Sequence, residues 1–174
     1  MSRAKDERAA IEISRFLAGA AKTIASVRYC WLLTEAEAGG ANARPMGRVL
    51  AGPDESDWTI LFITDGRSRK ASDIRRAGEV GLIFQHDPDA AFVAFTGRAA
   101  LLERASEIRR LWKDAYSIYF PSEADRAKAI FVEVNVERME LWIRGVTPEP
   151  FGLHPTVLER DAGGTWRLSD RNAA

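Results

Sequence analysis

Residues 62–78 read FITDGRSRKASDIRRAG and combine the end of a strand, a turn and the beginning of a helix. An apolar run ends at Thr64, and the following Asp65-Gly66 is a turn dipeptide. Ser68 is a preferred helix N-cap, and Gly78 is a preferred residue just past a helix C-terminus. This stretch therefore predicts a strand, a tight turn and a short helix in direct succession.

The positive charges of this stretch lie at the unfavourable end of the predicted helix. Arg67, Arg69 and Lys70 crowd its N-terminus, where unpaired N–H groups already carry partial positive charge. Arg75 and Arg76 occupy the C-terminal end, where cations are favourable. Two interpretations are open. The N-terminus binds a phosphate together with nearby hydroxyl groups, or it is a solvated basic turn that costs about a few tenths of a kcal/mol per charge.

The composition is that of an ordinary globular protein. The 174 residues are 46% hydrophobic and 29% charged, and 25 basic residues balance 25 acidic residues. This balance gives no global basic field for nucleic acid. The single cysteine excludes an internal disulfide and fits a reducing cytoplasm. The charged N-terminus lacks a signal-peptide pattern, and no run approaches the roughly 18 apolar residues of a membrane helix.

Outward from the opening stretch, the pattern predicts a mainly β protein with flanking helices. Gly97 is expected at a bulge or bend, and Pro45 on an edge strand or at the start of a strand. A turn is expected over 53–57. The terminal residues 157–170 form either a small hairpin or a loose tail. Strands are expected over 27–34, 44–52, 58–64, 80–85, 91–102 and 129–144, and helices over 4–24, 105–116 and from Ser122 to Lys128. Six strands in hairpin order favour an antiparallel barrel.

Obvious catalytic groups are absent from the sequence. It contains no nucleophile-elbow, zinc-protease, dinucleotide-binding or paired-cysteine motif. His86, near Asp87 and Asp89, belongs to either a metal site or a solvated turn. Cys30 is either a small core residue or a reactive thiol. A phosphate-binding turn without an acid, base or nucleophile favours a cofactor that supplies its own chemistry.

Trp112 and Trp142 are the aromatic residues with two open interpretations. Each either packs in the core or forms a wall of a pocket for a flat ligand. No spacing in the sequence decides between these roles.

The order of several short motifs resembles the FMN-binding split-barrel superfamily that includes pyridoxamine 5′-phosphate oxidase, and within it the general stress protein 26 branch. The resemblance spans residues 10–145 and implies a six-stranded antiparallel split β-barrel that binds FMN. The motifs that carry it are Arg44-Pro45-Met46, Thr64, Ser68-Arg69-Lys70, Asp87-Pro88, Leu111-Trp112, Phe120-Pro121 and Glu140-Leu141-Trp142.

The resemblance also implies roles for individual residues. Ser68, Arg69 and Lys70 would hold the FMN phosphate with help from Arg44 and Thr64. The family is usually homodimeric with FMN at the subunit interface. The residues expected near the flavin itself are Pro45, Met46, Ile63, Trp112 and Trp142, the two tryptophans from either subunit.

The implied function is that of an FMN-dependent oxidoreductase that transfers a hydride at the flavin to or from an unidentified small molecule. The alternative is a carrier or redox sensor that holds FMN without turnover. Other relatives bind deazaflavin or haem. Residues 143–146 lack the arginine-histidine motif of pyridoxamine phosphate oxidases, so vitamin B6 oxidation is not implied. Residues 146–174 form an extension of their own beyond a domain at 1–145.

A nucleic-acid interface is the competing interpretation of the basic residues. It would use Arg67, Arg69, Lys70, Arg75 and Arg76 as a patch for phosphates of the backbone. The neutral overall charge and the lack of interleaved aromatic residues weigh against it.

Overall fold

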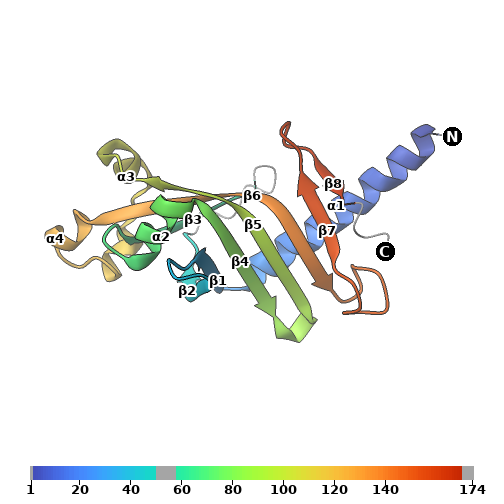
Figure 1. Ribbon diagram of the computed structural model, residues 1–174, viewed down its shortest axis with the longest axis horizontal. Coiled ribbons are helices and arrows are strands. Elements are labelled where there is room, and N and C mark those ends of the chain that lie inside the picture. The colour runs from blue at the N-terminus through green and yellow to red at the C-terminus, as the bar shows by residue number, and fades with distance from the viewer. Residues whose placement is uncertain (1, 50–57, 170–174) are drawn as a thin grey trace.

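The computed structural model describes residues 2–49 and 58–169 of the chain, with side chains from residue 7 onward. One curved antiparallel sheet forms the body of the molecule, and a long helix crosses it (Figure 1). The strands are β1 Tyr29–Glu35, β2 Ala41–Gly47, β3 Thr59–Asp65, β4 Glu79–His86, β5 Ala91–Leu102, β6 Ala129–Ile143, β7 Thr156–Arg160 and β8 Trp166–Leu168. The helices are α1 Ser2–Ser26, α2 Arg69–Ala77, α3 Ala105–Leu111 and α4 Glu123–Arg126, with 3-10 turns η1 Asp87–Asp89 and η2 Asp114–Ile118.

The long strand β6 organises the sheet. It pairs with β5 along most of its 15 residues. Its other edge is shared, because β3 pairs with the first half and β7 with the second half. The strand order is β2-β1-β4-β5-β6-β7-β8, with β3 beside β6. In Figure 1 the two halves of β6 diverge toward α3 and α4 at one end and toward β7 and β8 at the other.

The expectation of a mainly β, antiparallel fold with flanking helices is confirmed. The expectation of a six-stranded barrel is wrong, because the described residues form eight strands in an open sheet. The two additional strands come from the C-terminal residues, where the hairpin and not the loose tail is found. They exist because β3 pairs with β6 only as far as Asn135, so the second half of β6 keeps an edge that β7 covers. Beyond β2, the N–H of Val49 donates to the Leu61 carbonyl at 2.8 Å, which brings the first six strands toward closure.

The predicted bulge at Gly97 is confirmed. The register between β5 and β6 shifts between Thr96 and Gly97. A Cβ atom at Gly97 would lie only 2.0 Å from the Asn135 carbonyl oxygen, so the two strands approach too closely for any side chain. This bend lets a single strand serve both halves of the sheet.

The core lies between α1 and the concave side of the sheet. Phe16, Ala20 and Ile24 form the buried stripe of α1, as the helical spacing predicts. A smaller cluster around Val49, Tyr116 and Phe131 lies at the α3 end and includes the partly buried Trp112. The hydrophobic interior therefore extends along the whole length of β6.

Several element boundaries differ from the prediction. The strand expected over 44–52 begins earlier, at Ala41, because it pairs with β1 up to the turn at Gly39 and Gly40. Its last residues, 50–52, and the predicted turn over 53–57 lie outside the described residues. The helix predicted over 105–116 ends at Leu111, since Trp112 has extended backbone angles. Across the described ranges, no helix has the length and apolar content needed to span a membrane.

Candidate functional site

The N-terminus of α2 is built as the sequence predicts. The Ser68 side chain accepts a hydrogen bond from the Ala71 N–H at 3.4 Å, which caps the first turn. Gly78 ends the helix in the left-handed conformation with φ of 71°. The Thr64 and Ser68 hydroxyl oxygens lie 3.4 Å apart at the junction between β3 and α2. Two hydroxyl groups and the helix N-terminus therefore share one corner of the sheet.

This corner retains hydrogen-bond donors that the rest of the described chain does not use. Ser68 satisfies the Ala71 N–H, whereas the N–H groups of Arg69 and Lys70 have no acceptor within residues 2–49 and 58–169. The Arg67 side chain does not point into this space, because it folds back onto the Asp65 carboxylate at 2.6 Å. That contact, first through its hydrogen bonds, lowers the pKa of Asp65 to about 2.

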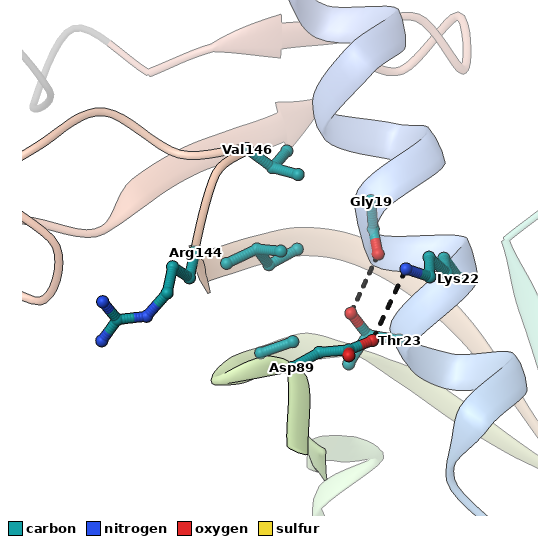
Figure 2. A pocket seen from close by; sticks show the side chains of 8 residues that line it. Gly19, Lys22, Thr23, Asp89, Arg144 and Val146 are labelled. Carbon is teal, nitrogen blue, oxygen red and sulfur yellow. Dashed lines mark hydrogen bonds and ion pairs between the residues drawn. The ribbon is translucent and has the colours of Figure 1, made fainter. Parts of the chain in front are cut away.

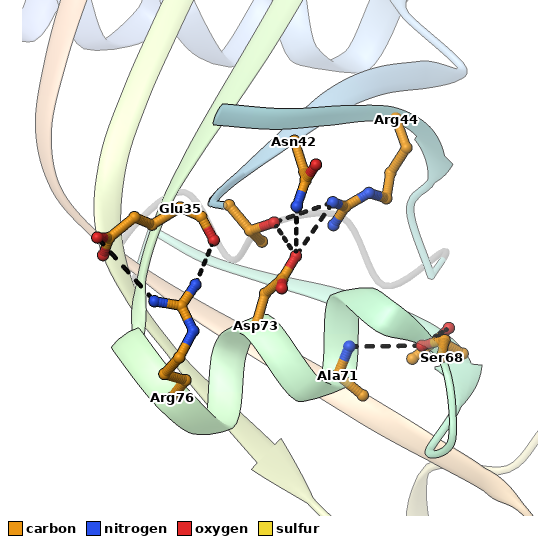
Figure 3. A network of polar contacts seen from close by, with 9 residues as sticks. Glu35, Asn42, Arg44, Ser68, Ala71, Asp73 and Arg76 are labelled. Carbon is orange, nitrogen blue, oxygen red and sulfur yellow. Dashed lines mark hydrogen bonds and ion pairs between the residues drawn. The ribbon is translucent and has the colours of Figure 1, made fainter. Parts of the chain in front are cut away.

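A buried carboxylate links α2 to the two strands beside it. The Oδ2 atom of Asp73 accepts hydrogen bonds from the Thr34 hydroxyl at 2.7 Å and the Asn42 amide at 3.1 Å. The guanidinium of Arg44 donates to the same oxygen at 3.4 Å and to Thr34 at 2.9 Å. Figure 3 shows Asn42 and Arg44 reaching from β2 toward Asp73. Burial by itself raises the pKa of Asp73, but these hydrogen bonds and the Arg44 charge together hold it below its usual value.

Arg44 is the most informative residue of this network. Its side chain is only 15% exposed, and its Nη1 atom is buried without a hydrogen-bond partner in the described chain. A buried cationic donor without an acceptor is costly. Lys70 lies close enough to feel the Arg44 charge, and its pKa is lowered by burial and then by that charge. Two neighbouring cations are an arrangement that a doubly charged anion such as a phosphate monoester would neutralise.

The remaining basic residues of α2 are engaged elsewhere. Arg75 pairs with Glu103 in the connection between β5 and α3. Arg76 donates to the Glu35 carbonyl oxygen at 2.5 Å and lies 4.0 Å from its carboxylate. These pairs and the Arg67 contact account for three of the five cations that a nucleic-acid patch would need. Arg69 and Lys70 form no ion pair with any described residue.

The residues expected near a flavin ring do not all lie on one surface of the structure. Met46 is buried in the main core, where its carbonyl accepts from the Cys30 thiol at 3.7 Å. Ile63 and Trp112 meet in the smaller cluster, at the same end of the sheet as Thr64. Pro45 is exposed on the outer face of β2, opposite Trp31. The structure thus brings Ile63 and Trp112 together near the α2 corner, whereas Met46 and Pro45 lie on opposite faces of β2.

Trp142 lies far from this corner within one chain. Thr64 pairs with Ile130 at the start of β6, whereas Trp142 pairs with Phe92 at its end. Twelve residues of extended strand separate them, which is about 40 Å. Trp142 can therefore approach the α2 corner only from another copy of the chain.

The two hollows found on the described surface are also remote from α2. The first, of about 230 Å³, lies between the second half of α1 and the end of β6. Figure 2 shows Lys22 and Asp89 meeting across it, while Arg144 points away from the helix. The second, of about 210 Å³, lies beside Phe16 and the proline-rich segment that follows β6. Neither contains a residue that the sequence predicts for the site.

The structure also bears on the hypotheses of a reactive thiol at Cys30 and a metal site at His86. Cys30 is buried, and burial raises the pKa of its thiol to about 12, which describes an inert core residue. His86 contacts one carboxylate, that of Asp89, at 3.4 Å. In the part of the chain that the structure describes, no three metal-ligating side chains come together.

Sequence reasoning missed Asp73, Thr34 and Asn42 as parts of the site. Thr34 and Asn42 lie 39 and 31 residues from Asp73, so their convergence is a product of the fold. One signal was present. Asp73 is the only acidic residue among residues 66–78 and directly precedes Ile74 of the predicted apolar stripe.

Comparisons with known proteins identify a family and several solved structures that resemble this chain. The family model of pyridoxamine 5′-phosphate oxidase-like proteins matches residues 18–147. No protein of curated function matches the chain by sequence. A solved protein from Clostridium acetobutylicum, related to general stress protein 26 of B. subtilis, is 19% identical with a TM-score of 0.68. The alignment covers 83% of this chain and 94% of that one.

Two further solved structures share the fold over most of their length. A pyridoxamine 5′-phosphate oxidase-related, FMN-binding protein from Nostoc punctiforme is 15% identical, with a TM-score of 0.65 and coverage of 92% of this chain and 93% of that one. PhzG from Burkholderia lata, solved with tetrahydrophenazine-1-carboxylic acid, is 19% identical, with a TM-score of 0.64 and coverage of 90% and 88%. At these identities the similarity establishes the common fold.

Proposed function

Since the chain belongs to the pyridoxamine 5′-phosphate oxidase-like family, we propose that it is a flavoprotein that binds FMN at the N-terminus of α2. The observation that carries this proposal is the buried, unpartnered Nη1 atom of Arg44 beside Lys70. A phosphate monoester supplies the acceptors and the negative charge that this arrangement lacks. The FMN-binding relative from Nostoc punctiforme supports the choice of flavin among phosphorylated ligands.

The phosphate is held by groups from three elements. Arg44 and Lys70 donate charge-assisted hydrogen bonds, and Arg69 adds a third cation at the rim. The first N–H groups of α2 and the hydroxyls of Thr64 and Ser68 complete the set of donors. A phosphate at this place also removes the unfavourable interaction between these cations and the helix dipole.

The flavin ring lies over the surface between β2 and the α3 end of the sheet. Ile63 and Trp112 supply the apolar side chains of this surface, and Pro45 and Met46 contribute backbone groups of β2. When bound, the flavin supplies hydride transfer at its N5 atom, while the protein positions it and excludes water. The substrate is a small molecule that stacks on the exposed side of the ring.

The outer face of the sheet carries an exposed apolar row that fits the contact of a homodimer. Trp31 on β1 is 50% exposed, and its cross-strand neighbours Pro45 and Ile83 are exposed beside it. Large apolar side chains gathered on one surface mark an interaction site. This row spans the outer faces of β1, β2 and β4, and a second copy of the chain seated on it would bury these side chains. The partner is also the proposed source of Trp142 near the flavin.

The carboxylates near the site favour a protein that holds the flavin over one that performs acid–base chemistry. Asp65 is engaged by Arg67, and Asp73 is engaged by three donors, and both have lowered pKa values. Neither is therefore available as a general base near neutral pH. A carrier or redox sensor is the second candidate function for this reason.

The decisive experiment is a visible absorption spectrum of the untreated purified protein, followed by mass spectrometry of the released ligand. FMN should be released, and titration of ligand-free protein with FMN should quench the flavin fluorescence to saturation. A colourless protein with no saturable quenching would overturn the proposal. A haem or deazaflavin spectrum would replace FMN by that ligand.

Anaerobic reduction distinguishes the two candidate functions. Reduction of the bound flavin by NADH or NADPH, followed by reoxidation with small-molecule acceptors, supports the oxidoreductase. A bound flavin that neither nucleotide reduces supports the carrier or sensor.

A further inference from the structure

The Asp73 carboxylate has an unusual position for a charge on a helix that binds an anion. Its side chain is only 9% exposed, and a single oxygen atom accepts hydrogen bonds from Thr34, Asn42 and Arg44. A negative charge one turn from a phosphate-binding N-terminus repels the phosphate. We therefore looked for a favourable effect of the Asp73 carboxylate on binding that would offset this repulsion.

The geometry of Arg44 indicates that role. Its Nη2 atom is fixed by Thr34 at 2.9 Å and by Asp73 at 3.4 Å, whereas its Nη1 atom has no partner. The guanidinium is a rigid planar fork, so fixing one nitrogen also fixes the direction of the other. The Nη2 atom of Arg44 is therefore bound by the protein, whereas its Nη1 atom can donate to a ligand.

We propose that Asp73 is a positioning residue that, with Thr34, orients the Arg44 fork so that the Nη1 atom meets the ligand phosphate. The inference rests on the proposed function and deepens it. It assigns the preference for a phosphorylated flavin over riboflavin to a carboxylate that does not touch the ligand. Preorganising the fork before binding removes part of the ordering cost that a free arginine side chain would incur.

Two physical effects of Asp73 have opposite signs, which makes the proposal testable. If Asp73 acts only through its charge, then replacing it with neutral asparagine strengthens FMN binding, because a repulsion disappears. If Asp73 orients Arg44, then the same replacement weakens FMN binding, because the fork loses its charge-assisted hydrogen bond. Riboflavin, which lacks the phosphate, should respond to neither effect.

The experiment measures dissociation constants of the full-length Asp73→Asn protein for FMN and riboflavin by fluorescence quenching. We expect FMN to bind about tenfold more weakly and riboflavin to change less than about twofold. An FMN-to-riboflavin affinity ratio that stays constant or rises overturns the proposal. Glu103→Gln is the matched control, because it neutralises the carboxylate that pairs with Arg75 of the same helix and should leave the ratio unchanged.

A double-mutant cycle with Arg44→Met separates positioning from general damage. In the Arg44→Met background, Asp73→Asn should change the affinity ratio less than about twofold, since the fork that it orients is gone. An undiminished effect in that background contradicts the proposal. If Asp73→Asn does not fold, Thr34→Val gives the same test, because it removes a bond to each partner. Wild-type protein that binds no FMN would instead overturn the proposed function itself.

Discussion

The indole rings of Trp58 and Trp166 meet edge to face with their centroids 5.8 Å apart. Trp58 directly precedes β3, and Trp166 begins β8, so this contact joins the C-terminal hairpin to the interior of the sheet. Both rings are buried. The residues beyond the family match therefore help to build the same core.

Trp166→Ala should destabilise the protein by about 3–5 kcal/mol, because it removes a large buried aromatic ring and leaves a cavity. The measurement is urea unfolding followed by tryptophan fluorescence. Tyr119→Ala is the control, since Tyr119 is 61% exposed and its loss should change stability by less than about 0.5 kcal/mol. Equal effects of the two substitutions would contradict the structural role of the hairpin.

Gly97→Ala should be strongly destabilising, although the change adds only a methyl group. The new Cβ would lie 2.0 Å from the Asn135 carbonyl oxygen, so β5 and β6 would have to separate. We expect a loss of about 1–3 kcal/mol or more in thermal or chemical unfolding. Gly81→Ala on the adjacent strand is a matched control, because its Cβ would meet Leu33 at an ordinary 3.4 Å. A Gly97→Ala protein as stable as the wild type would disprove the close strand approach.

Replacing Arg69 and Lys70 together by alanine should weaken FMN binding more than about hundredfold through the loss of two charge-assisted interactions. The fold should remain intact, because neither side chain belongs to the core and both are unfavourable at a helix N-terminus. The matched control is the double change of Arg75 and Arg76 to alanine. That variant loses the same charge from the same helix, but it should keep its flavin and lose stability instead. Retention of flavin by the first variant would refute the phosphate site.

Trp31→Asp should convert the proposed dimer into a monomer by placing a charge in its apolar contact. Sedimentation velocity measures the change, and flavin affinity should fall with it if FMN lies at the interface. Ile118→Asp is the control, because Ile118 is 79% exposed and lies on η2, outside the strands that carry the apolar row. A Trp31→Asp protein with unchanged mass would locate the contact elsewhere.

The contribution of Asp73 to stability should depend on pH in the acidic range. Its folded-state pKa lies below the ordinary value of 3.8, so the carboxylate stabilises the fold above that pH. The stabilisation is lost as pH falls through 3.8 toward the folded-state pKa. At pH 7, Asp73→Asn should therefore be less stable than wild type by about 3 kcal/mol, and this gap should narrow below pH 4. A gap that is constant from pH 7 to pH 3 would show that the Asp73 charge contributes nothing.

Local structure was predictable wherever one residue and its immediate neighbours set the backbone. Ser68 caps α2, Gly78 ends it, and Gly97 marks the bulge, as their chemistry predicts. The motif order also led to the correct family, which the match over residues 18–147 confirms. The number of strands was not predictable, because β7 is a strand only where the second half of β6 leaves an edge.

The candidate site also has a part that local sequence sets and a part that the fold sets. The sequence by itself determined a basic turn between a strand and a helix, with hydroxyl groups and free N–H groups placed for an anion. Only the tertiary structure decided that Thr34 and Asn42 converge on Asp73, that Asp73 contacts the Arg44 guanidinium and that Trp142 lies at the other end of β6. Helix caps and turns depend on a few consecutive residues. Buried charge networks depend on strand register, which brings together residues 30 to 40 positions apart.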